Sequence, residues 1–447
     1  MSVQEFQSGL SSRVRDGRVH IAVYGAGRVG ATVTAAWLRA GAKVILADID
    51  RKRIESIMAG SPLFSDEPQI DETLREGFKA RRFVATTHPA QAAAMADVNV
   101  VAVPVGLKGG QADLSSVRSV FGEISARIRK GSLSILETSV PPGTCREVVL
   151  PILQRGSGLK ADEDFGFAYS PERIFEGRAL ADLEENYAKI VAGVGPSSLR
   201  AASSLYSCIA KKGTIELSSL ETAEAEKLFE GVYRDVNIAL ANELGVLSEK
   251  LGVDYWEAMR AANSQPFSHL HRPGPGVGGA CIPVYPVFVS ASAKSRHAKT
   301  QLAKAARRIN RSMPSLVARE AISYLKGRQR HVAVLGLAFR GDIADDRMSP
   351  TYDLLKELKR LRCVVKVHDP LVRRDMAGGY PVFADLAAAL KGCQLVLLAT
   401  DHRAYRDLDY KIISTASGSE PLVYDSRGIL DRSKFPPGKL LVLGRPQ

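Results

Sequence analysis

The sequence predicts an α/β protein in which two doubly wound domains are joined by a central helical domain with one long helix. Short apolar runs alternate with helical patterns at both ends of the chain, whereas the middle contains 31 residues without proline, Glu221–Leu251. The chain of 447 residues is also too long for one ordinary core. We therefore expect three domains, at residues 1–215, 216–315 and 316–447.

The N-terminal elements alternate in the order that a parallel sheet requires. His20–Tyr24 reads as a buried strand, a glycine-rich turn and an alanine-rich helix continue to Gly41, and Lys43–Ala47 reads as the next strand. Alternation of strands with helices predicts a parallel sheet covered by helices. The later strands of this domain are expected at residues 98–103, 133–136, 165–169 and 189–192.

The long central helix is predicted by apolar residues at helical spacing between Leu228 and Leu251, and Gly252 is expected to end it. A second alternating block starts after Met313-Pro314 and lacks a complete GxGxxG turn. Its strands are expected at residues 332–336, 364–369, 395–399 and 422–425.

Charge and hydropathy limit the classes of partner. The 61 Lys and Arg residues outnumber the 48 Asp and Glu residues, and the net charge of +13 favours an anionic partner. No basic run with interleaved aromatic residues predicts nucleic-acid binding, so a phosphorylated small molecule is the preferred ligand. No apolar run has membrane-spanning length and the N-terminal residues are polar, so we expect no membrane partner and a cytoplasmic location.

The five cysteines are widely spaced and form no CxxC pair. This pattern excludes a disulfide framework and a zinc site, and we expect no metal. Most of these thiols should be buried, as free cysteines usually are.

The turn Gly25-Ala-Gly27-Arg-Val-Gly30 follows a strand and opens a helix, which is the context of a Rossmann-like dinucleotide site. Asp48 ends the next strand, where a carboxylate accepts hydrogen bonds from the adenosine ribose and repels a 2′-phosphate, which favours NAD over NADP. The alternative is an α/β turn that merely needs glycine. The predicted cofactor-binding residues are Gly25, Gly27, Arg28, Val29, Gly30, Asp48, Arg53, Pro104 and Ser139.

The segment Arg272–Pro283 is crowded with glycine and proline, which excludes both helix and strand. Its backbone N–H groups can surround phosphates, and it presents the thiol of Cys281. The alternative is a tight structural turn that buries a cysteine.

Taken with these motifs, four further segments resemble the UDP-glucose/GDP-mannose dehydrogenase family over nearly the whole chain: ETSVPPGT (137–144), SPER (170–173), EKLF (226–229) and LGLAFRG…DDRMSP (335–350). The SPER and GPGVGG forms are more similar to the UDP-N-acetylmannosamine dehydrogenase branch. The resemblance implies oxidation of the C6 hydroxyl of a UDP-sugar to a uronic acid with two NAD⁺, for polysaccharide biosynthesis. We also expect a homodimer with the long helix Glu221–Leu251 as its core, because the apolar positions of that helix exceed one face.

By the same resemblance, Cys281 is the nucleophile, Lys227 the cation beside the reacting oxygen, Glu172 a proton-transfer group, and Ser139 a hydroxyl near the hydrolytic water. Without the resemblance, Lys227 would read as part of a solvated helix face. The implied substrate-binding residues are Glu172, Arg173, Glu176, Lys227, Arg234, Asn237, Arg272, Gly276, Gly278, Gly279, Arg340 and Arg347.

Three positions depart from the family pattern. Gly231 stands where the family usually has Asn, Tyr285 where it has Asp, and Ala280 where this branch commonly has His. These departures leave a non-catalytic nucleotide-sugar-binding protein as an alternative, beside a UDP-glucose 6-dehydrogenase. A two-electron 3-hydroxyacid dehydrogenase would share the N-terminal turn and helical middle, but it gives no reason for the cysteine loop or for a second α/β domain.

Overall fold

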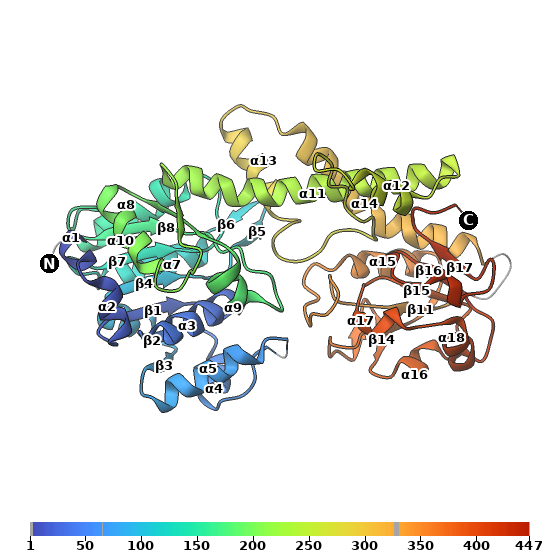
Figure 1. Cartoon of the computed structure of the whole chain (residues 1–447), viewed down its shortest axis with the longest axis horizontal. Coiled ribbons are helices and arrows are strands. Elements are labelled where there is room, and N and C mark those ends of the chain that lie inside the picture. Colours follow the sequence, from blue (N-terminus) through green and yellow to red (C-terminus); the bar gives the residue numbers. More distant parts are fainter. Residues whose placement is uncertain (1–2, 65, 326–329, 447) are drawn as a thin grey trace. The chain divides into compact units, whose positions relative to one another are not determined.

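The computed structural model describes residues 3–64, 66–325 and 330–446. It divides into two compact units, Met1–Phe229 and Glu230–Gln447. The division falls inside the long helix α11 (Leu220–Leu251), the light-green helix of Figure 1. The predicted central helix is confirmed, and Gly252 follows its end with a φ of 70°. The three-domain division stays a prediction.

The first unit is built on an eight-stranded sheet with helices on its faces (Figure 1). Strands β1, β4, β7 and β8 are almost entirely buried, which is the reason that they are mostly apolar, with Asn99 in β4 and Ser134 in β7 as buried polar exceptions. The strand order is β10 (Thr214–Glu216), β9 (Lys189–Gly193), β8 (Gly166–Tyr169), β7 (Leu133–Leu136), β4 (Val98–Val101), β1 (His20–Tyr24), β2 (Lys43–Ala47) and β3 (Phe83–Thr86).

One strand direction differs from the prediction. Strands β8 to β3 of this order are parallel, but β9 pairs antiparallel with β8. A parallel return needs a crossover that is usually a substantial helix. The link between β8 and β9 contains only the short helical segments α9 (Ala179–Ala181) and 182–186, so the chain returns in the opposite direction. Alternation of apolar runs does not encode this difference.

The other helices of the first unit cover its sheet or extend from it. They are α1 (Val3–Gln7), α2 (Leu10–Arg15), α3 (Arg28–Ala40), α4 (Arg51–Met58), α5 (Pro68–Lys79), α6 (Pro89–Met95), α7 (Ser115–Ser125), α8 (Leu150–Ser157), α10 (Pro196–Tyr206) and a π-helical segment, Cys145–Val149. A hairpin of β5 (Gly106–Lys108) and β6 (Gln111–Asp113) lies outside the sheet.

The second unit contains a seven-stranded sheet whose strands are parallel except for one edge hairpin. The order is β13 (Met376–Ala377), β14 (Tyr380–Phe383), β12 (Val364–His368), β11 (His331–Leu335), β15 (Leu395–Leu398), β16 (Leu422–Asp425) and β17 (Leu440–Val442). Its helices besides α11 are α12 (Tyr255–Ala262), α13 (Tyr285–Ser295), α14 (Gln301–Ser323), α15 (Pro350–Arg360), α16 (Leu386–Leu390), α17 (Arg403–Arg406), α18 (Tyr410–Ser417) and a 3₁₀ turn, Arg432–Lys434.

The sheets confirm the predicted α/β class with two doubly wound domains and a long central helix. Helix α14 runs through Met313-Pro314, where we expected the second α/β block to begin, and the first strand after it is β11. Proline inside a helix cannot donate to the carbonyl four residues earlier, but it does not prevent the helix from continuing. In the described ranges we find no helix with the length and hydropathy that crossing a bilayer would need.

Candidate active site

The glycine-rich turn has the geometry of a dinucleotide cradle. Gly25 has a φ of 101°, and a Cβ added at Gly30 would lie 1.7 Å from the Gly25 carbonyl oxygen, so both positions require glycine. Gly27, the residue before helix α3, would place an added Cβ in open space. This open approach to a helix N-terminus fits a pyrophosphate, and Val29 packs half-buried against the core behind it.

Asp48 lies where the ribose of a bound dinucleotide is expected, at the carboxyl end of β2. Its carboxylate already accepts from the backbone N–H of Ala26 (2.6 Å) and of Asp50 (2.9 Å). It therefore also holds the glycine-rich turn in place. Arg53 lies exposed in α4, and its backbone N–H donates to Asp50.

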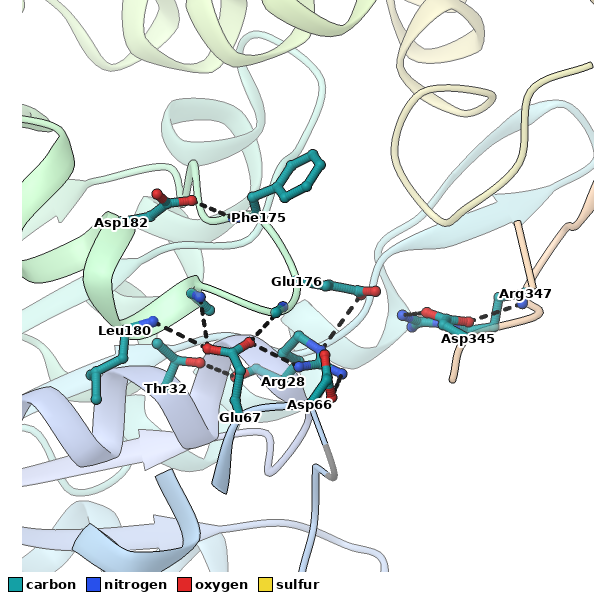
Figure 2. Close-up of polar contacts among 12 residues, drawn as sticks. Arg28, Thr32, Asp66, Glu67, Phe175, Glu176, Leu180, Asp182, Asp345 and Arg347 are labelled. Carbon is teal, nitrogen blue, oxygen red and sulfur yellow. Dashed lines mark hydrogen bonds and ion pairs between the residues drawn. The ribbon is translucent and has the colours of Figure 1, made fainter. Parts of the chain in front are cut away.

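Arg28 is surrounded by carboxylates (Figure 2). Its guanidinium donates to Glu67 and Asp66, each at 2.9 Å, lies 3.7 Å from Glu176, and stacks over Phe64. These acids raise the pKa of Arg28 against its burial, which acts in the opposite direction and is the largest single influence. The predicted cofactor residue Arg28 and the predicted substrate residue Glu176 thus meet in one cluster.

The carboxylate of Glu67 joins this cluster to the segment that follows SPER. It accepts from the backbone N–H groups of Gly177 (3.0 Å), Ala179 (2.7 Å) and Leu180 (3.3 Å). Figure 2 shows the contact with Leu180. Glu67 is fully buried. The sequence does not predict this role of Glu67, because an isolated glutamate before a helix carries no sequence signal of its long-range partners.

The other predicted residues of this unit follow successive parallel strands. Pro104 comes after β4, Ser139 after β7, and Glu172 after β8. Because the carboxyl ends of parallel strands lie at one edge of a sheet, the fold brings all three to the edge that carries Gly25 and Asp48.

Glu172 belongs to a buried ionic network that the sequence did not reveal. Lys189 Nζ lies 2.5 Å from Glu172 and 3.2 Å from Glu137, and Tyr206 donates to Glu137 at 2.6 Å. Burial raises the pKa of Glu137, although the ammonium of Lys189 opposes this. The pKa of Lys189 is raised by its two carboxylates against the larger opposing influence of burial. Arg173 donates to the carbonyl of Ala188 beside this network.

Glu224, one helical turn before Lys227, connects α11 to the loop that carries Ser139. Its carboxylate accepts from the backbone N–H groups of Gly143 (2.6 Å) and Cys145 (2.7 Å). Burial raises the pKa of Glu224 to about 7. Lys227 itself is half-buried.

In the second unit, the glycine-rich loop is irregular as predicted and packs closely on the segment that precedes α15. An added Cβ would lie 2.9 Å from Pro350 at Gly276, 2.6 Å from Phe339 at Gly278, and 2.9 Å from the Phe339 ring at Gly279. The Gly279 N–H also donates to the carbonyl of Arg347 (3.0 Å). Glycine is needed at these three positions for packing.

Cys281 follows this loop and is the exposed cysteine among the five. Burial raises the pKa of Cys145 and Cys208, and it raises those of Cys363 and Cys393 to about 11. Since the thiolate is the nucleophilic form, these four thiols are held in their unreactive state. Cys281 is the accessible thiol at a position that the loop presents.

The remaining predicted substrate residues also lie in this unit. Arg340 is half-buried, Arg347 is exposed and pairs with Asp345, Arg234 and Arg272 are exposed, and Asn237 donates to the Tyr233 carbonyl (2.7 Å).

The sequence reasoning missed the polar residues at the carboxyl ends of β12 and β15. Asp369 accepts from the backbone N–H groups of Leu337 (2.7 Å) and Ala338 (2.9 Å), and its Oδ2 lies 3.1 Å from Nε2 of the buried His402. Arg427 pairs with Asp401 at 3.0 Å and lies beside Gly274. The signal was available, because polar residues directly after predicted strands commonly face ligands.

The comparisons with known proteins agree with this geometry. Three models of the UDP-glucose/GDP-mannose dehydrogenase family match: its NAD binding domain at residues 19–210, its central domain at 221–312, and its UDP binding domain at 333–432. A UDP-N-acetyl-D-mannosamine dehydrogenase of Pyrococcus horikoshii is 32% identical over 94% of this chain and 97% of its own length. An NDP-N-acetyl-D-galactosaminuronic acid dehydrogenase of Ralstonia nicotianae is 31% identical over 92% and 96%.

Solved structures give the same result for the fold. The UDP-D-ManNAc dehydrogenase of Pyrococcus horikoshii superposes with a TM-score of 0.86, and the alignment covers 95% of this chain and 99% of that one at 32% identity. The UDP-N-acetyl-mannosamine dehydrogenase of Staphylococcus aureus gives a TM-score of 0.83 at 29% identity, covering 95% and 98%. The predicted NAD cofactor and oxidoreductase class are confirmed. The chain belongs to the UDP-glucose/GDP-mannose dehydrogenase family.

Proposed function

We propose that this protein oxidises the C6 hydroxyl of a UDP-N-acetylhexosamine, with UDP-N-acetylmannosamine as the first candidate, to the corresponding uronic acid. The observation that carries the proposal is the accessible Cys281 at the end of a glycine-rich loop that packs on the domain matching the UDP-binding model. The names of relatives that act on N-acetylated sugars support the choice of sugar over UDP-glucose.

The residues of the first unit would bind the cofactor. The open space at Gly27 and the N-terminus of α3 suit a pyrophosphate, and the Asp48 carboxylate suits the ribose hydroxyls. NAD⁺ supplies the hydride acceptor when it is bound. Pro104 and Ser139 lie at the same edge of the sheet, where they would line the nicotinamide side.

Cys281 would carry the substrate through the second half of the reaction. Its thiolate adds to the C6 aldehyde left by the first hydride and proton loss, and a carbon–sulfur bond forms. Loss of a second hydride gives a thioester, and attack of water then breaks the carbon–sulfur bond to release the carboxylate and the thiol. Two hydrides leave each sugar, so two NADH form per turnover.

Three further residues would assist this chemistry. The Lys227 ammonium stabilises the oxygen that becomes negative, a role in which a fixed charge in a dry site contributes several kcal/mol. Glu172 serves proton transfer, and Lys189 holds it in position, since the two are 2.5 Å apart. Ser139 would orient the hydrolytic water.

We propose substrate-binding roles for residues in three segments, each taken by itself: SPER with Arg173 and Glu176, helix α11, and the loops of the second unit. The residues proposed beyond the first segment are Arg234, Asn237, Arg272, Gly276, Gly278, Gly279, Arg340 and Arg347. Glu176 lies 3.7 Å from Arg28, so a proposed substrate-binding residue and a proposed cofactor-binding residue form an ion pair.

We also propose a homodimer built on α11. Large apolar side chains on this helix are exposed: Phe229, Tyr233, Leu240, Leu247 and Leu251. Such a stripe is typical of an interface. Light scattering that gives the mass of one chain would remove this part of the proposal. A cytoplasmic location stays a prediction from the sequence.

The test is NADH formation at 340 nm with UDP-glucose, UDP-N-acetylglucosamine, UDP-N-acetylmannosamine, UDP-galactose and GDP-mannose. We expect two NADH per molecule of one N-acetylated sugar, and no acid from the Cys281→Ala variant. Cys208→Ala is the matched control, because that thiol is half-buried and its pKa is raised by burial. Turnover of UDP-glucose alone would correct the sugar. No NADH with any sugar, while UDP-sugars still bind, would contradict the enzyme and favour a binding protein.

A further inference from the structure

The two departures at Gly231 and Tyr285 lie against one another in the second unit. A Cβ added at Gly231 would lie 2.3 Å from Cδ2, 3.1 Å from Cγ and 3.2 Å from Cβ of Tyr285. Carbon atoms in contact are about 3.5–4.0 Å apart, so any side chain at position 231 would overlap the tyrosine. Tyr285 is 6% exposed, which shows that its ring is packed in this space.

The backbone conformation at position 231 does not require glycine. It lies inside α11, where glycine is the poorest helix former except proline, and it does not have the positive φ that favours glycine. The close contact also involves the Cβ and Cγ of Tyr285, which a rotation of the ring cannot move away. The glycine is therefore explained by the tyrosine.

Tyr285 is in turn tied to Cys281 through the backbone. The N–H groups of Val284 and Tyr285 both donate to the Cys281 carbonyl at 3.0 Å, and Tyr285 begins α13. This closed turn makes the position of the Cys281 backbone depend on where the Tyr285 ring packs. Gly231 lies four residues after Lys227, and therefore one turn further along the same face of α11.

We infer that Gly231 and Tyr285 form one matched pair, in which the ring packs on the bare helix backbone, and that Tyr285 is a positioning residue for the Cys281 nucleophile. This inference rests on the proposed role of Cys281. The Asn and Asp of the family pattern are replaced together by Gly231, which has no side chain, and by Tyr285, whose ring fills the space beside it. The two departures are therefore a single change. They are not two separate losses of catalytic groups.

A double-mutant cycle tests the pair. Gly231→Ala and Tyr285→Leu are each expected to lower kcat by about 100-fold with a smaller change in KM for NAD⁺, because a displacement of about 1 Å at a reacting group has that effect. Gly231→Asn/Tyr285→Asp is expected to have a higher kcat than either Gly231→Asn or Tyr285→Asp. Gly122→Ala is the control, since an added Cβ there meets open space among the described residues.

A second readout does not need turnover. The rate of Cys281 alkylation by iodoacetamide, followed by peptide mass spectrometry, should change about tenfold in Gly231→Ala and Tyr285→Leu. It should be retained in Tyr285→Phe, which keeps the ring, and in Gly122→Ala. If no nucleotide sugar is turned over, the proposed function fails, but the alkylation rates still decide the pairing. If Gly231→Ala does not fold, Tyr285→Leu decides alone.

Wild-type alkylation and kcat in Gly231→Ala or Tyr285→Leu would overturn the inference. The inference would also be overturned if the fold-changes in kcat of Gly231→Asn and Tyr285→Asp simply multiplied in the Gly231→Asn/Tyr285→Asp variant, because residues in contact are expected to show coupling.

Discussion

Replacing Lys189 tests whether the buried ionic network stabilises the first unit. Its side chain is 4% exposed and lies between Glu137, which is fully buried, and Glu172, which is 7% exposed. Lys189→Met removes the cation but keeps an unbranched chain of similar length. Two buried carboxylates then lose their partner, and removing one member of a buried ion pair costs about 3–5 kcal/mol. The loss should grow with rising pH, because the orphaned carboxyl groups must be protonated to stay buried.

The measurement uses the two tryptophans of the chain. Trp37 is buried in the first unit and Trp256 lies in the second, so a Trp256→Phe background reports urea unfolding of the first unit alone. Lys211→Met is the control: Lys211 contacts Glu185 at 2.6 Å, but the side chains are 70% and 53% exposed, and no change in midpoint is expected. Equal midpoints for the two variants would refute the argument that the buried network stabilises this unit.

Three other outcomes are expected. Burial raises the pKa of Glu224 from 4.5 to about 7, so the folded state binds this proton more tightly and stability falls by on the order of 3 kcal/mol as pH rises from about 4.5 through 7. Glu224→Gln should remove this pH dependence from urea midpoints measured between acid and neutral pH. An unchanged pH dependence would exclude Glu224 as its cause. Glu67→Ala should destabilise the first unit by about 3 kcal/mol in the Trp37 assay, since three buried backbone N–H groups and Arg28 lose the carboxylate that accepts from them, whereas the exposed Glu72, in the helix that follows Glu67, should tolerate alanine. Asp48→Asn should weaken the preference for NAD⁺ over NADP⁺ by about tenfold in kcat/KM, and an unaltered ratio would mean that Asp48 serves only the turn at Ala26.

The fold class was accessible from the sequence because its signals are local. A strand buried on both faces is mostly apolar, as in β15, and a dinucleotide turn needs glycine at Gly25 and Gly30 for steric reasons that act within a few residues. The long helix could also be predicted, since its apolar residues at helical spacing and the Gly252 that follows its end lie in one segment of the sequence. The direction of β9 was not accessible from the sequence: the alternating pattern predicts a parallel strand, but β9 is antiparallel to β8.

Some features of the candidate site could likewise be predicted from the sequence, and others required the structure. The identity of Cys281 as the thiol of an irregular loop follows from glycine and proline nearby in the chain, whereas its accessibility, against four thiols held protonated by burial, required the packed structure. The buried network around Lys189 and the carboxylate of Glu67 were invisible, because each joins positions that are far apart in the chain.

The sequence by itself therefore determined the α/β class, the dinucleotide turn and the irregular glycine-rich loop before Cys281, which depend on backbone conformation and on periodicity over short distances. Only the tertiary structure decided which charges compensate one another in the interior, because Coulomb interaction and desolvation depend on distance through space. It also decided how Gly231 and Tyr285 relate. In the sequence they are two unconnected departures, and in the structure they are the two surfaces of one contact.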